Sequence, residues 1–354
     1  MTAPTDDALY RALIDRDPAL DGFWYVGVRT TGIFCRLTCP ARKPKRENVV
    51  FFDRPGEAER AGFRPCLRCR PLDRGRPVDP TLARLRGQVA AEPDRRWTAA
   101  DLAALGYDPS TVRRAFKREY GVTFAQYARA QRLGAAVTGL RDGAPVIEAQ
   151  LDAGYASASG FREAVTRLLG EAPARLRGRP ALPARWLDTP IGAMLAVADD
   201  GGVHLLEFAD RTALPRELDR LQRRSGPVLF GQHPMLDRLA GQVERYFAGA
   251  DLSFDLPVAQ AGSAFQAAVW AALRRLPAGA TCSYGELARA LGRPDAVRAV
   301  AGANGANQVA IIVPCHRVVG ADGSLVGYGG KPWRKRWLLE HERRHARSTD
   351  RGNP

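Results

Sequence analysis

The chain has 354 residues and is 45% hydrophobic, which predicts two or three globular domains and excludes a disordered protein. No apolar run is long enough to span a bilayer, and the polar, acidic first residues are unlike a signal peptide, so we expect a cytoplasmic protein without membrane contact. The formal net charge is +15, with a basic excess in every part of the chain. This charge suits a protein that binds DNA, although an Arg-rich proteome would also explain it.

Four of the six cysteines form two close pairs near the N-terminus: Cys35 with Cys39, and Cys66 with Cys69. In a cytosolic protein, paired spacings of this kind favour a metal site over disulfides. Four thiolates suit one tetrahedral Zn²⁺ ion, at about 2.3 Å from each sulfur. We therefore predict one zinc site with four cysteine ligands and no organic cofactor. The usual role of such a site is to staple a small domain.

The charge of this cluster suggests a second role. Zn²⁺ with four thiolates is formally anionic, and the thiolates remain nucleophilic because they are already deprotonated. Alkylation of one thiolate would weaken the repulsion between the cluster and DNA phosphates, which makes an electrostatic switch. Basic residues crowd the cluster and are candidates for contact with the DNA backbone: Arg36, Arg42, Lys43, Lys45, Arg46 and Arg68.

Three segments of this region, VRTTGIFCRLTCPAR (28–42), RENV (46–49) and FRPCLRCRP (63–71), closely resemble the N-terminal domain of the Ada family of bacterial adaptive-response proteins. In that family the first of the four cysteines accepts a methyl group from a methylphosphotriester in the DNA backbone. The resemblance implies that Cys35 is this acceptor and that the other three cysteines complete the zinc site.

The middle of the chain reads as helices. Thr98 can cap one helix that Gly106 ends, and Asp108 with the following proline opens a second helix. The second helix has one apolar face and one basic face, which is typical of a recognition helix in the major groove. The residues expected to face the core are Val112, Ala115 and Phe116, and those expected to face outward are Arg113, Arg114, Lys117 and Arg118.

A similar pattern recurs over residues 146–165, where Arg162 is the candidate DNA contact, followed by Arg167. A plain helical bundle with solvated arginines would explain one such pattern, but two in tandem favour DNA binding. The pair resembles the AraC-type DNA-binding domain. The Pro- and Arg-rich residues 179–185 then break the helical periodicity and read as a linker.

From residue 186 the pattern changes to short β-like runs and then to helices. Residues 281–291 are predicted to form a helix, and residues 295–304 a second helix lined with small side chains that carries the long cation Arg298. This second helix suits minor-groove binding with extrusion of a base, or equally close packing against another helix. An apolar run then leads to Cys315 and His316. A thiolate that attacks a methyl group forms a stable thioether, so each molecule would act once.

The segment NQVAIIVPCHRVV (307–319) strongly resembles the active-site signature of the O6-alkylguanine-DNA alkyltransferases, and the resemblance extends from about residue 186 to 342. It implies that Cys315 accepts the alkyl group, that His316 acts through water as its base, and that Glu342 orients the histidine. Asn307 matches the active-site turn. The resemblance also assigns Tyr284 to base rotation and the departing guanine, Arg298 to the vacated base stack, and Val318 and Tyr328 to the guanine pocket.

The chain departs from this family at a few positions. Some relatives have proline at the positions of Gln308 and Ala310, and the sequence of the loop 329–332 is particular to this chain. Cys282 matches no catalytic position, so we expect a half-buried structural thiol.

The predicted fold is multidomain α+β. It comprises a zinc-stapled α/β domain at 1–76, an all-α tandem helix-turn-helix domain at 80–178, a linker at 179–185, and a C-terminal α/β alkyltransferase at 186–345. The last domain contains a ribonuclease-H-like subdomain and a helical active-site subdomain.

The predicted function is irreversible, single-turnover transfer of methyl groups from O6-methylguanine and O4-methylthymine to Cys315, and from methylphosphotriesters to Cys35. Methylation of Cys35 would switch on promoter binding and transcription of alkylation-repair genes. The expected partners are double-stranded alkylated DNA, promoter DNA and RNA polymerase. We expect a monomer that acts at the nucleoid in the cytoplasm of a bacterium.

Three other functions compete with this prediction. A transcription factor whose C-terminal domain no longer reacts is disfavoured, because the signature residues around Cys315 are all present. A repair protein that regulates nothing stays open, since no motif marks a surface for RNA polymerase. A zinc hydrolase is excluded, because four cysteine ligands leave no open coordination position.

Overall fold

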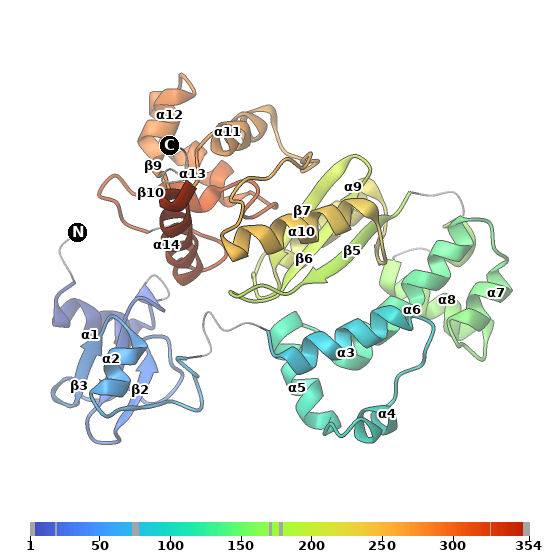
Figure 1. The fold of residues 1–354 in the computed structure, drawn as a ribbon, viewed down its shortest axis with the longest axis horizontal. Coiled ribbons are helices and arrows are strands. Elements are labelled where there is room, and N and C mark those ends of the chain that lie inside the picture. The colour runs from blue at the N-terminus through green and yellow to red at the C-terminus, as the bar shows by residue number, and fades with distance from the viewer. Residues whose placement is uncertain are drawn as a thin grey trace. The chain divides into compact units, whose positions relative to one another are not determined.

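The computed structural model describes residues 4–17, 20–72, 78–169, 172–176, 180–325 and 327–349. The chain forms two compact units (Figure 1). One unit comprises Met1–Arg76, Gly262–Asn307 and Ile311–Pro354, and the other comprises Pro77–Ala261 and Gln308–Ala310. The predicted alkyltransferase region therefore contributes to both units. Within the described residues, no helix is long and apolar enough to cross a membrane.

The N-terminal part of the first unit is a four-stranded sheet with two helices. Its elements are α1 (Asp6–Asp15), β1 (Tyr25–Val28), β2 (Ile33–Arg36), the 3-10 turn η2 (Arg46–Asn48), β3 (Val49–Phe52), α2 (Pro55–Arg60) and β4 (Arg64–Pro65). The strand order is β3-β1-β2-β4, with β1 antiparallel to both β2 and β3, and β4 parallel to β2. A Cβ atom at Gly27 in β1 would lie 2.9 Å from the rings of Phe52 and Phe63. The strand therefore needs glycine where these rings cross it.

The C-terminal part of the first unit is mostly helical. Its elements are α11 (Ala264–Arg274), β9 (Cys282–Ser283), α12 (Tyr284–Ala290), η4 (Pro294–Ala296), α13 (Val297–Gly305), η5 (Cys315–Arg317), β10 (Val318–Val319) and α14 (Pro332–Thr349). The helix predicted over 281–291 begins only at Tyr284, because Ser283 forms a capping box with Glu286 and the two residues before Tyr284 pair in parallel with β10. This pairing ties the start of α12 to the segment directly after Cys315.

The helical part of the second unit contains the two predicted helix-turn-helix patterns. Its elements are α3 (Pro80–Ala91), α4 (Ala99–Ala104), α5 (Pro109–Tyr120), α6 (Phe124–Arg141), α7 (Val146–Asp152), α8 (Ala158–Leu169) and η3 (Pro173–Arg175). Thr98 and Asp108 cap α4 and α5, as predicted. On α5, Val112 and Phe116 are buried and Ala115 is half-buried. The four basic residues expected to face outward, Arg113, Arg114, Lys117 and Arg118, are exposed.

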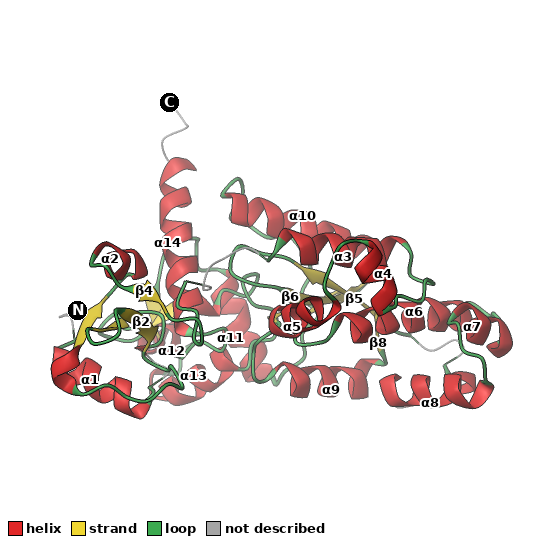
Figure 2. Ribbon diagram, turned by 90° about the horizontal axis from the view of Figure 1, so that it is seen from below, coloured by secondary structure: helices red, strands yellow, loops and turns green. Residues whose placement is uncertain are grey.

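The remaining part of the second unit is a second four-stranded sheet. Its elements are β5 (Leu182–Leu187), β6 (Met194–Asp199), β7 (Gly202–Phe208), α9 (Leu214–Ser225), β8 (Val228–Phe230) and α10 (Pro234–Ala248). The strand order is β7-β6-β5-β8, in which only the β5–β8 pair is parallel. Helices α9 and α10 lie on opposite sides of this sheet (Figure 2).

The expected linker at 179–185 needs a correction, because residues 182–185 form the first part of β5. They pair with β6 on one side and with β8 on the other. Leu182, Ala184 and Trp186 alternate toward the interior and are buried, whereas Pro183 and Arg185 between them are half-buried. The proline and arginine give the segment the composition of a linker and hide the alternation of a strand.

Two candidate cysteine centres

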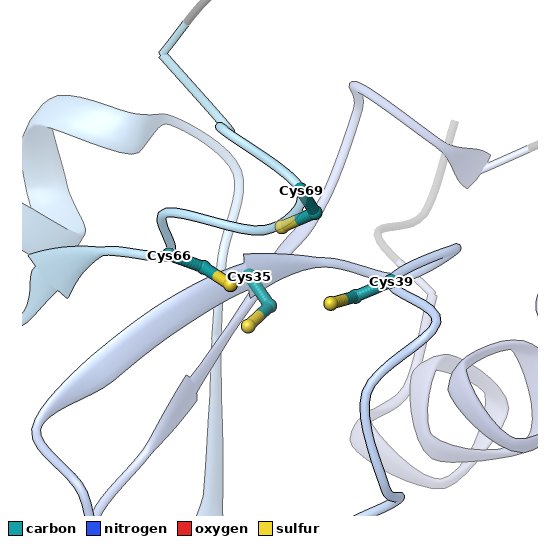
Figure 3. A group of neighbouring side chains, drawn as sticks. All are labelled: Cys35, Cys39, Cys66 and Cys69. Atoms are coloured by element: carbon teal, nitrogen blue, oxygen red, sulfur yellow. The ribbon is translucent and has the colours of Figure 1, made fainter.

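The first centre lies where β4 pairs with β2. This pairing places Phe34 opposite Pro65, and the amide of Cys66 donates to the carbonyl of Phe34 at 3.0 Å. The two cysteine pairs, distant in the sequence, are thereby brought together. The four Sγ atoms lie within 4.8 Å of one another, and all four residues are buried. Figure 3 shows Cys35, Cys39, Cys66 and Cys69 grouped around a common point.

Hydrogen bonds among the four thiols give them different pKa values. The hydrogen bond between Cys35 and Cys69, followed by burial, raises the pKa of Cys35. The same bond lowers the pKa of Cys69 to about 5, and the backbone amide of Arg36 assists by donating to the Cys69 Sγ at 3.4 Å. Four sulfurs this close repel one another when ionised, unless a cation lies between them. The four sulfurs suit one tetrahedral Zn²⁺ ion and would leave it no open coordination position.

A cavity of about 190 Å³ adjoins three of the four cysteines. Its lining includes Cys35, together with the basic residues Arg42 and Lys43. Cys35 is 8% exposed, so its sulfur is shielded but lies beside a space that a small group can enter. The cavity therefore places positive side chains beside the predicted acceptor.

The other basic candidates around this centre have different surroundings. Arg46 pairs with Asp6 at 3.5 Å and Asp7 at 3.3 Å, and Lys45 lies 3.8 Å from Glu47. Surface pairs of this kind are weak and can exchange for phosphate contacts. Arg36 is half-buried, whereas Arg68 is exposed on the turn between Cys66 and Cys69.

The second centre surrounds Cys315, which is buried at the start of η5. The side-chain amide of Asn307 donates to Cys315 Sγ at 3.1 Å and to the carbonyl of Val313 at 2.8 Å. Asn304, at the end of α13, donates to the carbonyl of Cys315 at 3.3 Å. Two asparagine side chains thus fix both the backbone and the sulfur of Cys315.

The turn that leads to Cys315 is strained. Ile311 has φ = 72°, in the left-handed region that a β-branched residue rarely adopts. Just before it, the carbonyl of Gln308 accepts from the amide of Leu206 at 2.9 Å, and the amide of Ala310 donates to the carbonyl of Leu206 at 2.8 Å. Strain of this kind persists only where the surrounding contacts determine the backbone. The turn is therefore held by tertiary hydrogen bonds to Leu206.

Glu342 binds the other side of the second centre. Its carboxylate lies 2.8 Å from Nε2 of His316 and accepts from Arg317 at 3.0 and 2.9 Å. It also accepts from the backbone amide of Gly279 at 3.0 Å. His316 and Glu342 are both fully buried. Nδ1 of His316 is buried and has no hydrogen-bond partner among the described residues.

Burial and charge act against each other in this pair. Burial lowers the pKa of His316, although Glu342 opposes the shift. Burial alone would raise the pKa of Glu342, but the interactions with His316 and Arg317 hold it below its ordinary value. The arrangement favours a neutral imidazole beside an ionised carboxylate, which is the protonation state that a general base requires.

Three further predicted residues of this centre, Tyr284, Val318 and Tyr328, are buried or half-buried. Tyr284 is half-buried at the start of α12, and burial, then the nearby Cys315, raises its pKa. A Cβ atom at Gly327 would lie 2.7 Å from the Tyr284 hydroxyl, so the loop passes closely over it. The ring of Tyr328 is 6.5 Å from that of His316. Val318 is buried in β10.

Arg298 is exposed on α13, away from the buried network around the sulfur. Small residues surround it on this helix, and a Cβ atom at Gly302 or Gly305 would meet nothing within 4 Å. The exposed side of α13 is therefore narrow and carries one long cation. Cys282 is half-buried, as expected, and burial raises its pKa.

Sequence reasoning missed Lys335 and Asn304. Lys335 is fully buried on α14, and burial lowers its pKa to about 8, against the opposing effect of Cys315. A lysine in a helix rich in arginine gives no local sign of burial. Its place seven residues before Glu342, on the same helical face, is the signal that marks it.

The structure places the predicted DNA contacts of the second unit on exposed surfaces. Arg113, Arg114 and Lys117 lie on the outer face of α5, and Arg162 is exposed on α8. The side chain of Arg167 lies outside the described residues.

Four segments of the chain match known protein families. Residues 8–72 match the metal binding domain of Ada, and residues 102–179 match a helix-turn-helix domain. Residues 184–260 match the ribonuclease-like domain of 6-O-methylguanine DNA methyltransferase, and residues 264–344 match the DNA binding domain of the same methyltransferase. A four-cysteine metal domain, a helix-turn-helix domain and a methyltransferase of this type together define a multidomain protein of the alkylated-DNA repair class.

Whole-chain relatives identify the family. The chain is 36% identical to the bifunctional transcriptional activator/DNA repair enzyme Ada of Escherichia coli, with 96% of this chain and 97% of that protein covered. It therefore belongs to the Ada family. The chain is also 44% identical to a methylated-DNA–protein-cysteine methyltransferase of Mycolicibacterium paratuberculosis, over 46% of this chain and 93% of that protein. The crystal structure of Mycobacterium tuberculosis O6-methylguanine methyltransferase covers 46% of this chain and 94% of its own, with 40% identity and a TM-score of 0.41.

The zinc centre predicts a metal-dependent fold for the N-terminal region. Purified protein should contain one zinc ion per chain, and Cys39→Ser should lower that ratio because it removes a ligand. Binding energy at a site of four thiolates is also folding energy, so a strong chelator should unfold this region. Elemental analysis and the circular dichroism of the chelated protein measure both effects. The matched control is Cys282→Ser, which should leave one zinc per chain, and a full complement of zinc in Cys39→Ser would contradict the site.

Glu342→Gln should destabilise the protein strongly, by about 3–5 kcal/mol, because it leaves the guanidinium of Arg317 buried without its carboxylate. The control is Glu340→Gln on the same helix, whose side chain is exposed and which should cost little. Urea unfolding of both variants measures the difference. Equal midpoints for the two variants would show that the network contributes nothing.

The direction of the two pKa shifts also predicts a pH dependence. The pKa of His316 is lowered, so the unfolded chain binds its proton first and stability falls as pH drops below about 6.5. The pKa of Glu342 is also lowered, so its contribution is complete above about pH 4.5 and is lost as pH falls further. Urea midpoints between about pH 3 and 8 test this. The acidic part of the loss should be smaller in Glu342→Gln than in Glu340→Gln.

Proposed function

We propose that this chain is a single-turnover DNA repair protein and transcriptional regulator with two methyl-accepting cysteines. Cys315 accepts the methyl group of O6-methylguanine, and of O4-methylthymine, in double-stranded DNA. Cys35 accepts the methyl group of a methylphosphotriester. The observation that carries the proposal is the set of contacts around Cys315, whose sulfur accepts from Asn307 beside the buried His316–Glu342 pair.

At Cys315, the thiol proton passes through a water molecule to Nδ1 of His316, and Glu342 stabilises the resulting imidazolium from the other ring nitrogen. The thiolate attacks the methyl carbon and forms a C–S bond while the C–O6 bond breaks. The electron pair stays on the base, which takes a proton from the hydroxyl of Tyr284. The product is an uncharged thioether, so Cys315 cannot react again.

Delivery of the base to this buried sulfur requires that the nucleotide leave the DNA stack. The exposed face of α13 suits this step, because its small residues allow close approach to the minor groove and Arg298 can fill the vacated position. Tyr328 and Val318 border the place where the guanine ring would lie. The close passage of the loop over Tyr284 shapes the same pocket.

At the first centre, Zn²⁺ when bound keeps the four thiolates deprotonated. The sulfur of Cys35 attacks the methyl carbon of the triester, and the C–O bond breaks to leave an ordinary phosphodiester anion. The formal charge of the centre falls from −2 to −1. Arg42 and Lys43 in the adjoining cavity, and Arg36, Lys45, Arg46 and Arg68 around it, then hold the DNA backbone with less repulsion.

The regulatory part of the proposal rests on the second unit. Arg113, Arg114, Lys117 and Arg162 contact promoter DNA, and methylation of Cys35 raises the affinity that turns on alkylation-repair genes through RNA polymerase. The protein acts as a monomer at the nucleoid. The proposed domains are 1–76, 80–178 and 186–345, with the ribonuclease-like sheet already begun at Leu182.

Two methylcysteines are expected when the protein meets DNA that carries both lesions. After incubation with DNA methylated at guanine O6 and at phosphates, mass spectrometry should find methyl on Cys315 and on Cys35, one per site. Cys315→Ser should keep only the Cys35 adduct, and Cys35→Ser only the Cys315 adduct. Methyl on Cys315 but never on Cys35 would remove the sensor, and methyl on neither would overturn the whole proposal.

Methylation at Cys35 should also strengthen binding to promoter DNA. Loss of one negative charge beside the DNA backbone should raise affinity about tenfold at low salt and less at high salt, because salt screens the effect. Fluorescence anisotropy on the protein before and after phosphotriester repair measures it. The control is protein methylated only at Cys315. Equal affinities of the two forms would leave a repair protein that regulates nothing.

A further inference from the structure

The helical part of the second unit and its four-stranded sheet share one hydrophobic core. The helical part contributes buried residues from α3 to α6, among them Leu85, Phe116, Tyr120 and Tyr127. The sheet contributes buried residues of the same cluster from β5, β6 and β7 and from α9, including Trp186. Two domains joined by a flexible linker would each bury a core of their own. Here the family boundary between residues 179 and 184 passes through one continuous core.

Aromatic rings make up the centre of this interface. Tyr120, at the last turn of the recognition helix α5, lies 5.6 Å from Trp186 of β5 between ring centroids. Tyr127 of α6 lies 5.8 Å from Phe230 of β8, and its ring meets that of Phe230 edge-on. Phe230 in turn stacks on Trp186. The inner side of α5 is thereby fixed against the sheet.

Asp188, directly after β5, joins the same elements through polar contacts. Its carboxylate accepts from Nη2 of Arg86 at 2.8 Å and from the hydroxyl of Tyr120 at 3.0 Å. Nη1 of Arg86 donates to the carbonyl of Trp186 at 2.7 Å. Arg86 comes from α3 and Tyr120 from α5, so one carboxylate links two helices of the DNA-binding part to the end of β5. Charge-assisted bonds in such half-buried surroundings are strong and directional.

Gly134 shows how close the two parts lie. A Cβ atom on this residue of α6 would be 2.5 Å from the carbonyl oxygen of Phe230 in β8, a backbone atom that cannot move aside without shifting the strand. Glycine in the interior of a helix is unfavourable by about 1 kcal/mol relative to alanine. Its presence here permits a contact that alanine would prevent. A Cβ atom added at Gly139 of the same helix would meet only the Cβ of Ala144, at 3.8 Å.

We propose that the helical DNA-binding domain and the ribonuclease-like subdomain form one rigid body. In this body the aromatic face of α3, α5 and α6 packs against the four-stranded sheet of β5 to β8 in the same chain. The outer face of α5, with Arg113, Arg114 and Lys117, stays exposed in this body, so docking and DNA binding are compatible. The recognition helix consequently moves with the sheet, and DNA held by α5 has a defined orientation relative to it.

The test is to cut the chain at the family boundary. A site-specific protease sequence replaces residues 177–179 in the full-length protein, and the cut protein is passed over a size-exclusion column. The two fragments should elute together at the mass of the intact chain and remain together on dilution. Separation of the wild-type fragments at micromolar concentration would overturn the proposal.

Two pairs of variants of the same cleavable protein test the contacts. Gly134→Ala should weaken the association of the fragments about tenfold or more, because the clash with Phe230 must push α6 away from the sheet. The matched control is Gly139→Ala, which makes the same chemical change in the same helix and should leave association intact. Asp188→Asn should also weaken association, whereas Asp237→Asn, which removes an exposed ion pair with Arg185, should not.

Folding is checked separately, so that a failed variant is not read as a broken interface. Circular dichroism of each uncut variant should match that of the wild type, and methyl transfer to Cys315 should proceed at the wild-type rate. If Gly134→Ala does not fold, Asp188→Asn carries the test. Association of both variant proteins with wild-type affinity would show that these contacts do not hold the two parts together.

Discussion

The carboxylate of Glu342 joins three segments that are distant in the sequence. It accepts hydrogen bonds from the amide of Gly279 and from Arg317, and it lies 2.8 Å from the ring of His316. A buried carboxylate is costly unless cations and donors surround it, and here the surrounding groups include His316 and Arg317, which directly follow Cys315. The buried carboxylate of Glu342 in α14 therefore holds His316 and Arg317 of η5 in place, and η5 sets the position of Cys315.

The two cysteine centres differ in how they can stabilise a thiolate. A thiolate needs stabilisation to be present at neutral pH, and four thiolates within 4.8 Å of one another need a cation among them. The first centre groups four sulfurs, a donor set that suits one Zn²⁺ ion. At the second centre Asn307, a neutral donor, donates to the sulfur, and burial of the next residue, His316, favours a neutral imidazole. In the proposed reactions, methylation would leave a charge at the first centre and none on the sulfur of Cys315.

The boundaries of families and the boundaries of packing differ in this chain. The methyltransferase region is divided between the two compact units, whereas the helix-turn-helix region and the ribonuclease-like sheet share a core. Sequence families follow inherited segments, but packing follows apolar faces that must be buried. The alternating strand Leu182–Leu187 illustrates this, because its inner residues complete a core to which α3, α5 and α6 also contribute.

Much of the local structure was predictable from the sequence. The spacing of four cysteines predicted a zinc site, cap residues such as Thr98 and Asp108 predicted where helices begin, and the segment around Cys315 led to a predicted acceptor. These signals act within a turn or two of chain, so they can be read directly. The burial of Lys335, the hydrogen bond from Asn304, the strand hidden in a Pro- and Arg-rich segment and the close approach at Gly134 depended on tertiary structure. The strand and the close approach at Gly134 are decided by β8, which lies far along the chain, and no local pattern encodes that partner.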